Sequence, residues 1–230
     1  MKHPIVIFYH IYCHGKWEEL VEGQLRKLRD SGVYDECLSM FVRVIGTPDD
    51  IDRYYSLIKG MKKIHTIQAD NKNDHEVSIL KAIRMLATET FPYREAANLE
   101  ASVLYLHTKG VYSSRESEEI ASRMTDWREY MEHFVVENWK ECISSLDEGF
   151  DVCGVDWREQ SLFGPIVGHF SGNFWWAKLS YIYTLPEIKD DWDRAYYEFW
   201  IGQRTPKAKC LYESGVDHYH ENYAKDRYSK

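Results

Sequence analysis

The sequence predicts an α/β fold in which a mostly parallel sheet is flanked by helices. Apolar runs of strand length alternate with segments of helical spacing from the N-terminus to residue 106. This alternation is typical of parallel strands joined by right-handed crossovers. The first of these runs is also almost continuously apolar, as expected for a strand that is buried on both faces.

The first two strand–helix units are clear in the sequence. Residues 4–13 (PIVIFYHIYC) predict a buried strand, and residues 16–32 carry apolar side chains at helical spacing up to a terminal glycine. Residues 37–45 (CLSMFVRVI) predict the second strand. Thr47 is expected to cap the helix that follows, with Pro48 at its first position.

The next unit contains strand 63–69, an amphipathic helix over 75–89 and strand 102–107. In open parallel sheets, ligands bind beyond the carboxyl ends of the strands. The residues that follow the predicted strands therefore become the first candidates for a site. They are His10, Ile11 and Tyr12, then residues 70–74, then residues 107–109.

The second half of the chain breaks this rhythm. Residues 116–146 predict one long helix or two consecutive ones. Shorter elements follow: strands over 150–155 and 169–177, and helices over 181–185 and 194–201. From residue 218 the tail is polar and has no usable periodicity. We expect a single domain over residues 1–230.

Composition limits the classes of function. The 44% hydrophobic and 29% charged residues are typical of a globular protein. A net charge of −8 argues against nucleic acid as a partner, but leaves room for a local cationic site for a diphosphate. The 15% aromatic content fits a tyrosine-rich core or a cleft that binds sugars, bases or proteins.

The five cysteines lack CxxC spacing, so we expect reduced thiols and a cytoplasmic protein. The N-terminal apolar run is too short for a signal peptide. No stretch reaches the roughly 18 apolar residues of a membrane span, so no transmembrane segment is expected. Peripheral membrane contact stays open.

Two strand ends carry residues suited to a nucleotide. Asp70, Asn71, Asn73 and Asp74 can bond the edge and ribose of a nucleotide, as can His10. The alternative for the segment 70–74 is an Asx turn with a helix cap. In the segment His107–Gly110, Lys109 can neutralise a diphosphate, and His107 can donate to a phosphate or ligate a metal. The alternative is a satisfied histidine and a solvated lysine.

Three later segments add candidates. Arg128, which follows Trp127, can reach a phosphate or stay on the helix surface. Ser171, Gly172 and Asn173, followed by Trp175 and Trp176, suit a platform for a sugar face; the alternative is a buried strand. Glu198 lies in an aromatic run that would raise its pKa toward that of a general base. It equally fits the polar face of a short helix.

Taken in order, the segments LHTKG, WR, DVCGV, HFSGNFWWA and EFWIG resemble one family. They are similar to the rhamnan-synthesis-F-type glycosyltransferases and to related small viral and bacterial glycosyltransferase domains. The resemblance covers roughly residues 5–205. It implies a GT-A-like fold with a Rossmann-type half over 1–112 that binds a nucleotide sugar. A mixed half over 113–205 would form the acceptor side, followed by a C-terminal tail over 206–230.

The resemblance also implies roles for particular residues. His107 and Lys109 stand where many GT-A enzymes carry an Asp-x-Asp metal motif, so Lys109 could replace the charge of a metal ion. Mn²⁺ or Mg²⁺ therefore stays an open cofactor, with Asp70, Asp74 and His107 as candidate ligands. Asn71, Asn73 and Asp74 match the nucleotide side, and Glu198 has the place of a general base in an inverting enzyme.

The expected function is transfer of a sugar from a nucleoside-diphosphate sugar to a hydroxyl of a glycan or small acceptor. A first alternative is a non-catalytic nucleotide-sugar or carbohydrate-binding module in a larger assembly. A second is nucleotidyl transfer, although the chain has no Gly-rich phosphate loop after its first strand. GxGxxG, P-loop, HExxH and GxSxG motifs are absent from the sequence.

Overall fold

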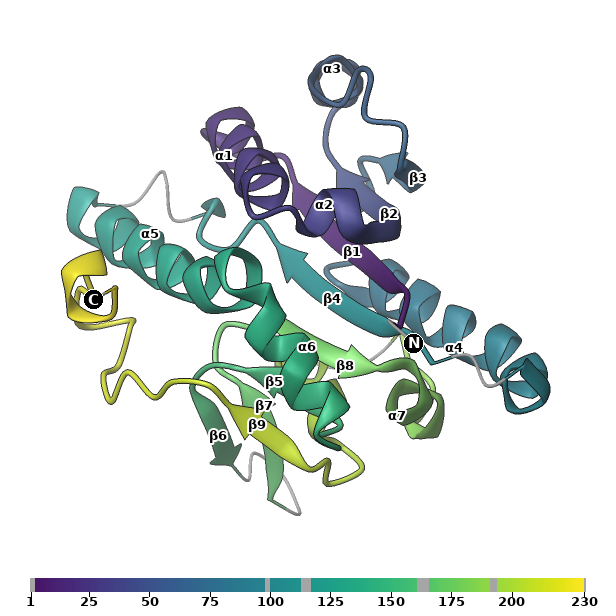
Figure 1. Cartoon of the computed structure of the whole chain (residues 1–230). Helices are drawn as coiled ribbons and strands as arrows, with labels where there is room; N and C mark the ends of the chain where they lie inside the picture. Colours follow the sequence, from purple (N-terminus) through teal and green to yellow (C-terminus); the bar gives the residue numbers. More distant parts are fainter. Residues whose placement is uncertain (1–2, 98–99, 113–116, 161–165, 191–193, 230) are drawn as a thin grey trace.

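The computed structural model describes residues 3–97, 100–112, 117–160, 166–190 and 194–229. Its centre is a seven-stranded sheet with the strand order β3-β2-β1-β4-β8-β5-β9 (Figure 1). Strands β1 to β4 are parallel, β8 runs antiparallel to both β4 and β5, and β9 is parallel to β5. The predicted α/β class with a mostly parallel sheet is confirmed.

The first half follows the predicted alternation of strands and helices. Its strands are β1 (Ile5–Tyr12), β2 (Cys37–Ile45), β3 (Ile64–Asp70) and β4 (Ser102–His107). Its helices are α1 (Trp17–Asp30), the short α2 (Val33–Glu36), α3 (Pro48–Leu57) and α4 (Val77–Ala97). Helix α3 begins as predicted, because the Thr47 side chain accepts from the Asp50 amide and Pro48 occupies the first turn.

The second half contains more and shorter elements than predicted. Its helices are α5 (Glu118–Glu132), a π-helical segment η2 (His133–Glu137), α6 (Trp139–Asp147), α7 (Leu179–Thr184), α8 (Arg194–Phe199), and the 3₁₀ turns η3 (Trp200–Gly202) and η4 (Lys225–Arg227). Its strands are β5 (Val152–Gly154), β6 (Trp157–Gln160), β7 (Val167–Phe170), β8 (Trp175–Lys178) and β9 (Ala208–Cys210). The predicted long helix is therefore two helices joined by a π-helical segment, and its predicted start at residue 116 lies outside the described residues.

One predicted strand is wrong. Residues 169–177 do not form a single strand: β7 ends at Phe170, a turn follows, and β8 begins at Trp175. Gly172 and Asn173 in this turn have φ angles of 90° and 62°, which a strand does not allow. The chain thereby leaves the small β6–β7 sheet and enters the main sheet beside β4.

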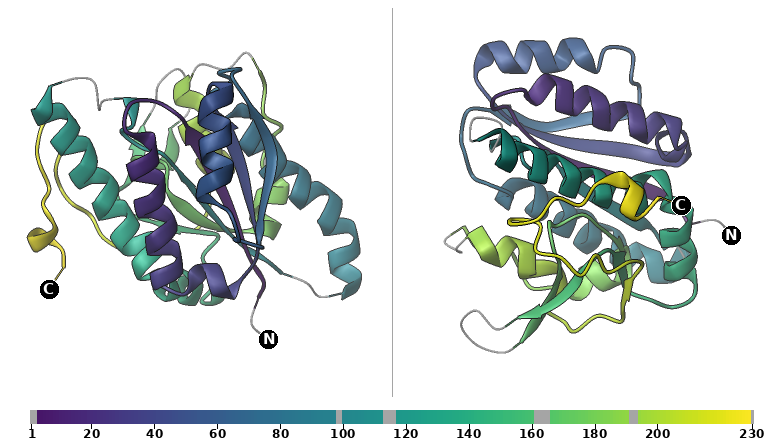
Figure 2. Two further views of the ribbon diagram at one scale, coloured as in Figure 1. Left: turned by 90° about the horizontal axis from the view of Figure 1, so that it is seen from above. Right: turned by 90° about the vertical axis from the view of Figure 1, so that its left-hand side faces the viewer.

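Helices cover both faces of the main sheet (Figure 2). Helices α1, α5 and α6 pack with one face of β1 and β4, while α4 and α7 pack with the other face. The C-terminal segment, drawn in yellow, lies against α5, where the Asn222 side chain donates to Ser122 and Asp126. The predicted tail over 206–230 is thus part of the fold, and its first residues supply strand β9.

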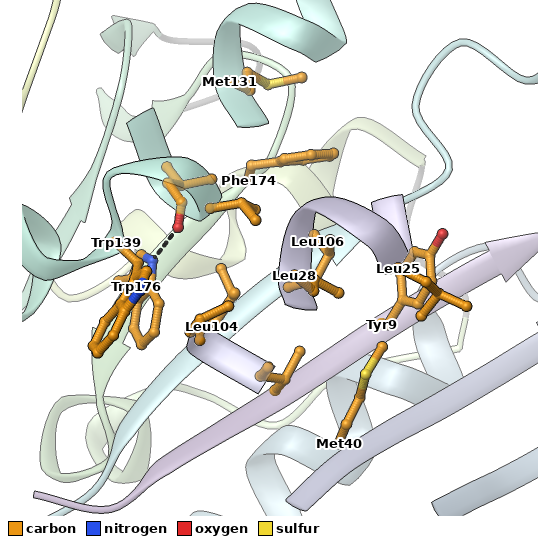
Figure 3. Close-up of a cluster of buried hydrophobic side chains, with 14 of the residues drawn as sticks. Tyr9, Leu25, Leu28, Met40, Leu104, Leu106, Met131, Trp139, Phe174 and Trp176 are labelled. Atoms are coloured by element: carbon orange, nitrogen blue, oxygen red, sulfur yellow. Dashed lines mark hydrogen bonds between the residues drawn. The ribbon is translucent and has the colours of Figure 1, made fainter. Parts of the chain in front are cut away.

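The core on the α1 side joins both halves of the chain. Leu104 and Leu106 of β4 lie beside Leu25 and Leu28 of α1, and Trp176 of β8 lies beside Trp139 (Figure 3). The Trp176 indole N–H donates to the Val135 carbonyl oxygen at 2.8 Å, the bond drawn in the close-up. Because β4 pairs with β8, the predicted halves 1–112 and 113–205 share one sheet and one core.

Candidate functional site

The strand order reverses between β1 and β4, because the crossovers run to β2 and β3 on one side and to β4 on the other. Open α/β sheets bind ligands at such a switch point, beyond the carboxyl ends of the strands. The ends of β1 and β4 are joined here by two hydrogen bonds. The Tyr12 amide donates to Thr108 Oγ1 at 2.9 Å, and the Thr108 amide donates to the His10 carbonyl oxygen at 3.1 Å.

The turn after β4 is held from the α1 and α5 side. Gln24 Nε2 donates to the His107 carbonyl oxygen at 3.3 Å, and an Arg128 guanidinium N–H donates to the Lys109 carbonyl oxygen at 3.1 Å. Arg128 Nε lies 3.6 Å from Glu132 Oε1. Arg128 thus fastens the turn, and the prediction that it reaches a phosphate is corrected by these two contacts.

Lys109 does not present its ammonium to the strand ends. Its Nζ lies 3.9 Å from the ring centroid of Trp127 and 5.7 Å from that of Tyr219, and its exposed fraction is 8%. These distances are typical of cation–π contacts. The alternative of a solvated lysine is wrong, because two aromatic rings cover the charge. That Lys109 neutralises a diphosphate stays a prediction.

A row of polar side chains crosses four strands on the α4 side of the sheet. His10 is in register with Arg43 on one side and His107 on the other, and Arg43 is in register with Gln68. They share a face with Phe8 and Tyr105, which belong to the α4-side core, because strand residues two apart point the same way. We call Gln68, Arg43, His10 and His107 the polar row.

His10 is neutral in this row. Burial, followed by the positive charges of His107, Arg43 and His75, lowers the pKa of His10 well below its ordinary value. The side chain is 5% exposed, and its Nδ1 has no hydrogen-bond partner among the residues that the structure describes. The prediction that His10 holds a nucleotide is not supported, because the His10 side chain is buried and not open to a ligand.

The segment 70–74 serves mainly the Arg43 guanidinium. The fully buried Arg43 donates to Asp70 at 2.8 Å, to Asp74 at 3.3 Å and to the Lys72 carbonyl oxygen at 2.9 Å. Asp74 also accepts from Ser78 in the first turn of α4. Hydrogen bonds from Gln68, the Lys72 amide and Arg43 lower the pKa of Asp70.

This arrangement favours the Asx-turn alternative over a nucleotide-reading loop. Asn73 Oδ1 accepts from the His75 amide at 3.1 Å, as in an Asx turn, and Asn71 is exposed. Within the described residues, no group of three or more His, Cys, Asp or Glu side chains is placed to hold a metal ion. Asp70, Asp74 and His107 therefore do not form the metal site that the resemblance left open, because Arg43 neutralises both carboxylates.

The β7–β8 turn lies beyond the carboxyl end of β4. Its Gly172 carbonyl oxygen is 3.0 Å from His107 Nε2, and the Ser171 amide donates to the Asp156 carbonyl oxygen. Asn173 is 1% exposed, and its Nδ2 donates to Glu76 Oε2 at 2.6 Å. The predicted Ser-Gly-Asn segment is thus placed beside His107, but Asn173 points into the protein.

Trp175 and Trp176 are core residues. Their exposed fractions are 1% and 0%, and their indole N–H groups donate to Asn173 Oδ1 and to the Val135 carbonyl oxygen. The prediction that either ring forms a stacking wall for a sugar is wrong, because both faces of β8 are covered by helices. The buried-strand alternative holds for these two residues.

That Glu198 is a general base stays a prediction, but its carboxylate is close enough to act on two other ionisable side chains. Its negative charge raises the pKa of His169 in opposition to the larger effect of burial, which lowers it. The same charge adds to burial and Glu76 in raising the pKa of Tyr105. Glu198 is half-buried. The Glu198 carboxylate thus lies within electrostatic range of Tyr105 in β4 and of His169 in β7.

An aromatic stack marks the other side of the switch point. The His14 ring lies parallel to Tyr12, with centroids 5.8 Å apart, and to Tyr112, with centroids 4.9 Å apart. Tyr112 is 64% exposed. Tyr12 is recognisable in the sequence only as a strand end. His14 and Tyr112 give no signal there, because their adjacency depends on the pairing of β1 with β4.

A second polar cluster was missed in the C-terminal tail. The buried Asp156 accepts from the Ser214 amide at 2.7 Å, from Ser214 Oγ at 2.8 Å and from His218 Nε2 at 3.0 Å. The His218 ring stacks on Trp127, with centroids 5.2 Å apart. The only sequence signal is the histidine-rich stretch HYH in an otherwise polar tail.

No helix in the described part of the chain is long and apolar enough to cross a membrane.

All five cysteines are free thiols, as expected from their spacing.

Comparison with solved structures gives distant likenesses. A 4-diphosphocytidyl-2C-methyl-D-erythritol synthase from Anaerococcus prevotii DSM 20548 is 13% identical with a TM-score of 0.44, over 99% of this chain and 95% of that one. A second crystal structure of a 4-diphosphocytidyl-2C-methyl-D-erythritol synthase is 11% identical with a TM-score of 0.43, over 98% and 95% of the two chains. At this level, the likeness assigns no activity to the chain.

No curated protein matches the sequence. Residues 8–229 match the model of a family that is described as a domain of unknown function, DUF8361. Since this match covers nearly the whole chain, the protein belongs to the DUF8361 family.

Proposed function

We propose that this protein is a glycosyltransferase that moves a sugar from a nucleoside-diphosphate sugar to a hydroxyl of a glycan or small acceptor. One observation carries the proposal: the half-buried carboxylate of Glu198 lies within electrostatic range of Tyr105 in β4 and His169 in β7. Strand β4 borders the switch point of the sheet, where α/β folds bind ligands. A carboxylate in such surroundings suits a general base.

The aromatic stack supports a nucleotide as the donor's carrier. Nucleobases stack on aromatic rings, and such contacts are worth roughly 1–3 kcal/mol per base. Tyr112 is the exposed ring of the stack and follows directly from the turn after β4. In the proposed complex the base lies against Tyr112, and the diphosphate lies near the backbone of the turn 107–110.

In the proposed reaction, Glu198 takes the proton from the acceptor hydroxyl. The hydroxyl oxygen then forms a bond to the anomeric carbon, and the bond from that carbon to the diphosphate oxygen breaks. The nucleoside diphosphate leaves with the bonding electron pair, and the sugar inverts in a single displacement. Lys109 contributes to the diphosphate only when Tyr219 moves away from its ammonium.

The test is incubation with a panel of nucleoside-diphosphate sugars, with and without Mn²⁺, while the release of free nucleoside diphosphate is followed. Acceptor-dependent release from at least one donor supports the proposal. If no donor is turned over in either condition, transferase activity is excluded for that panel. Donor binding without release would instead support a binding module. Pyrophosphate release from a nucleoside triphosphate would support nucleotidyl transfer.

Two variants test the assigned roles. Glu198→Gln is expected to lower kcat by about 10²–10⁴-fold while the donor still binds, on the usual scale for a general base. Glu187→Gln is the matched control, because Glu187 is an exposed carboxylate of the preceding loop. Tyr112→Ala is expected to raise the KM for the donor and leave kcat nearly unchanged, whereas Tyr55→Ala, at another exposed tyrosine, changes neither.

A further inference from the structure

Glu76 is a buried carboxylate immediately before helix α4. Its exposed fraction is 9%, and one of its oxygens, Oε2, accepts from Tyr105 Oη at 2.8 Å and from Asn173 Nδ2 at 2.6 Å. Hydrogen bonds to a charged acceptor are stronger than those between neutral groups. The carboxylate therefore joins the start of α4 to β4 and to the β7–β8 turn.

The Asn173 side chain has both of its ends fixed. Its Nδ2 donates to Glu76, and its Oδ1 accepts from the Trp175 indole N–H at 2.9 Å. Since a carboxylate only accepts and an indole only donates, the amide has a single orientation. Asn173 also has a left-handed backbone conformation, with φ at 62°. This conformation is disfavoured for residues other than glycine, so the turn has to be held in it.

The preceding residue places a backbone carbonyl against His107. Gly172 has φ at 90°, and an added Cβ would lie 2.4 Å from Met131 Sδ, so helix α5 limits the turn from behind. The Gly172 carbonyl oxygen is 3.0 Å from His107 Nε2. A carbonyl oxygen can only accept, so Nε2 carries a proton, and Nδ1 is the basic nitrogen whenever the ring is neutral.

We propose that Glu76 is a positioning residue that selects the Nε2–H tautomer of His107 through the Gly172–Asn173 turn. Without the carboxylate, the Asn173 amide loses the partner that holds the turn, and the Gly172 carbonyl is no longer fixed against the imidazole. His107 then distributes its proton between both nitrogens. This tautomer selection does not depend on the proposed function; only its effect on turnover rests on the glycosyltransferase proposal.

The decisive experiment is ¹⁵N NMR of the imidazole nitrogens, with His107 assigned by comparison with His107→Gln. In the wild-type protein we expect a single Nε2–H tautomer. In Glu76→Met and in Asn173→Gly we expect a mixture of tautomers, because each variant removes one partner of the hydrogen bond between residue 76 and the turn. Asn173→Gly keeps a residue that accepts positive φ, so it separates loss of the side chain from backbone strain.

Tyr105→Phe is the matched control. It removes the other donor to Glu76 Oε2 but leaves the Asn173 bond, so His107 should keep the wild-type tautomer. Urea unfolding and circular dichroism confirm that each variant is folded, and an unfolded Glu76→Met leaves Asn173→Gly to decide. A wild-type tautomer retained in the folded link variants overturns the proposal, as does an equal change in Tyr105→Phe.

Turnover supplies a second readout. If the glycosyltransferase proposal holds, Glu76→Met should lower kcat more than it changes the donor KM and should shift the pH profile. A tautomer change without any activity in the wild-type protein would confirm the positioning role and count against the proposed function. The two inferences therefore fail separately.

Discussion

The Lys109 ammonium lies 3.9 Å from the Trp127 ring, and the Tyr219 ring of the C-terminal segment closes over the same charge at 5.7 Å. The Tyr219 ring meets Trp127 edge to face, with centroids 5.0 Å apart, and is itself 56% exposed. The Tyr219 ring thus lies between solvent and the Lys109 ammonium. A short local opening of the C-terminal segment is enough to uncover Lys109.

Tyr219→Ala should accelerate acylation of Lys109. In the wild-type protein, Lys109 should react with an N-hydroxysuccinimide ester several-fold more slowly than the exposed Lys59 and Lys140, because Trp127 and Tyr219 cover it. Peptide mass spectrometry over a time course measures each lysine. Tyr55→Ala is the control for loss of an exposed ring. A wild-type Lys109 that reacts as fast as Lys59 would show that Tyr219 is not a cover.

The sequence predicted best what is decided locally. The apolar run 4–13 became β1 and the Thr47–Pro48 pair capped α3, since burial pattern and capping chemistry act within a few residues. Lys109 was misjudged because its surroundings come from Tyr219, a residue far along the chain. Glu76 was missed for the same reason: an acid before a helix is common, and only the fold brings Asn173 against it.

The Ser171-Gly172-Asn173 segment shows both what the sequence can predict and what it cannot. Its small and polar residues among aromatics were a valid signal of something other than a plain strand, and Gly172 and Asn173 do form a positive-φ turn. Their partners were not predictable, because Glu76 and Met131 reach the turn from two different helices. Trp175 and Trp176 were assigned to a surface, although the pairing of β8 inside the sheet buries them.

Asp70 and Asp74 should act as mutual substitutes in neutralising Arg43. The guanidinium is fully buried and pairs with both carboxylates, so each single Asp→Asn change leaves one partner. The double variant leaves a buried charge unpaired, at a cost of about 3–5 kcal/mol in the free energy of unfolding. We therefore expect the double variant to lose more than the sum of the singles.

Urea unfolding of the wild type, both singles and the double measures this coupling. The matched background is Arg43→Met, in which the buried charge is absent and the same double change should cost little. Additive losses, or an equal loss in the Arg43→Met background, would mean that the aspartates serve the Asx turn rather than the guanidinium.

His10 should make the protein less stable as the pH falls below about 6.5. Burial and the charges of His107, Arg43 and His75 lower its pKa in the folded state, so the unfolded chain binds a proton that the folded chain does not. The free energy of unfolding therefore decreases as the pH falls from the unfolded pKa to the folded one. The slope for one proton reaches about 1.4 kcal/mol per pH unit.

His10→Gln should remove this share of the slope, as measured by urea unfolding between pH 4.5 and 7.5. Part of the slope should remain, because burial also lowers the pKa of His169. His220→Gln is the control, since that side chain is 82% exposed. An unchanged slope in His10→Gln would mean that His10 is protonated in the folded protein.

Asp156 should fasten the C-terminal segment in a pH-dependent way. Burial raises the pKa of Asp156, but the hydrogen bonds from His218 and Ser214 outweigh it, so the pKa lies below its ordinary value. The stability that this carboxylate contributes is present above the unfolded pKa of about 3.9 and is lost as the pH falls through the folded pKa. Asp156→Asn removes the charge and should cost about 1.5–3 kcal/mol at pH 7.

The difference between wild type and Asp156→Asn should shrink as the pH falls below about 4, where protonation makes the two side chains alike in charge. Asp217→Asn is the control, because 64% of its side chain is exposed, while its carboxylate accepts from the Tyr219 amide and lies 4.0 Å from His220 Nε2. If Asp156 holds in place the C-terminal segment whose Tyr219 covers Lys109, Asp156→Asn should also speed Lys109 acylation at pH 7. A destabilised protein with unchanged Lys109 reactivity would separate the anchor at Asp156 from the cover at Tyr219.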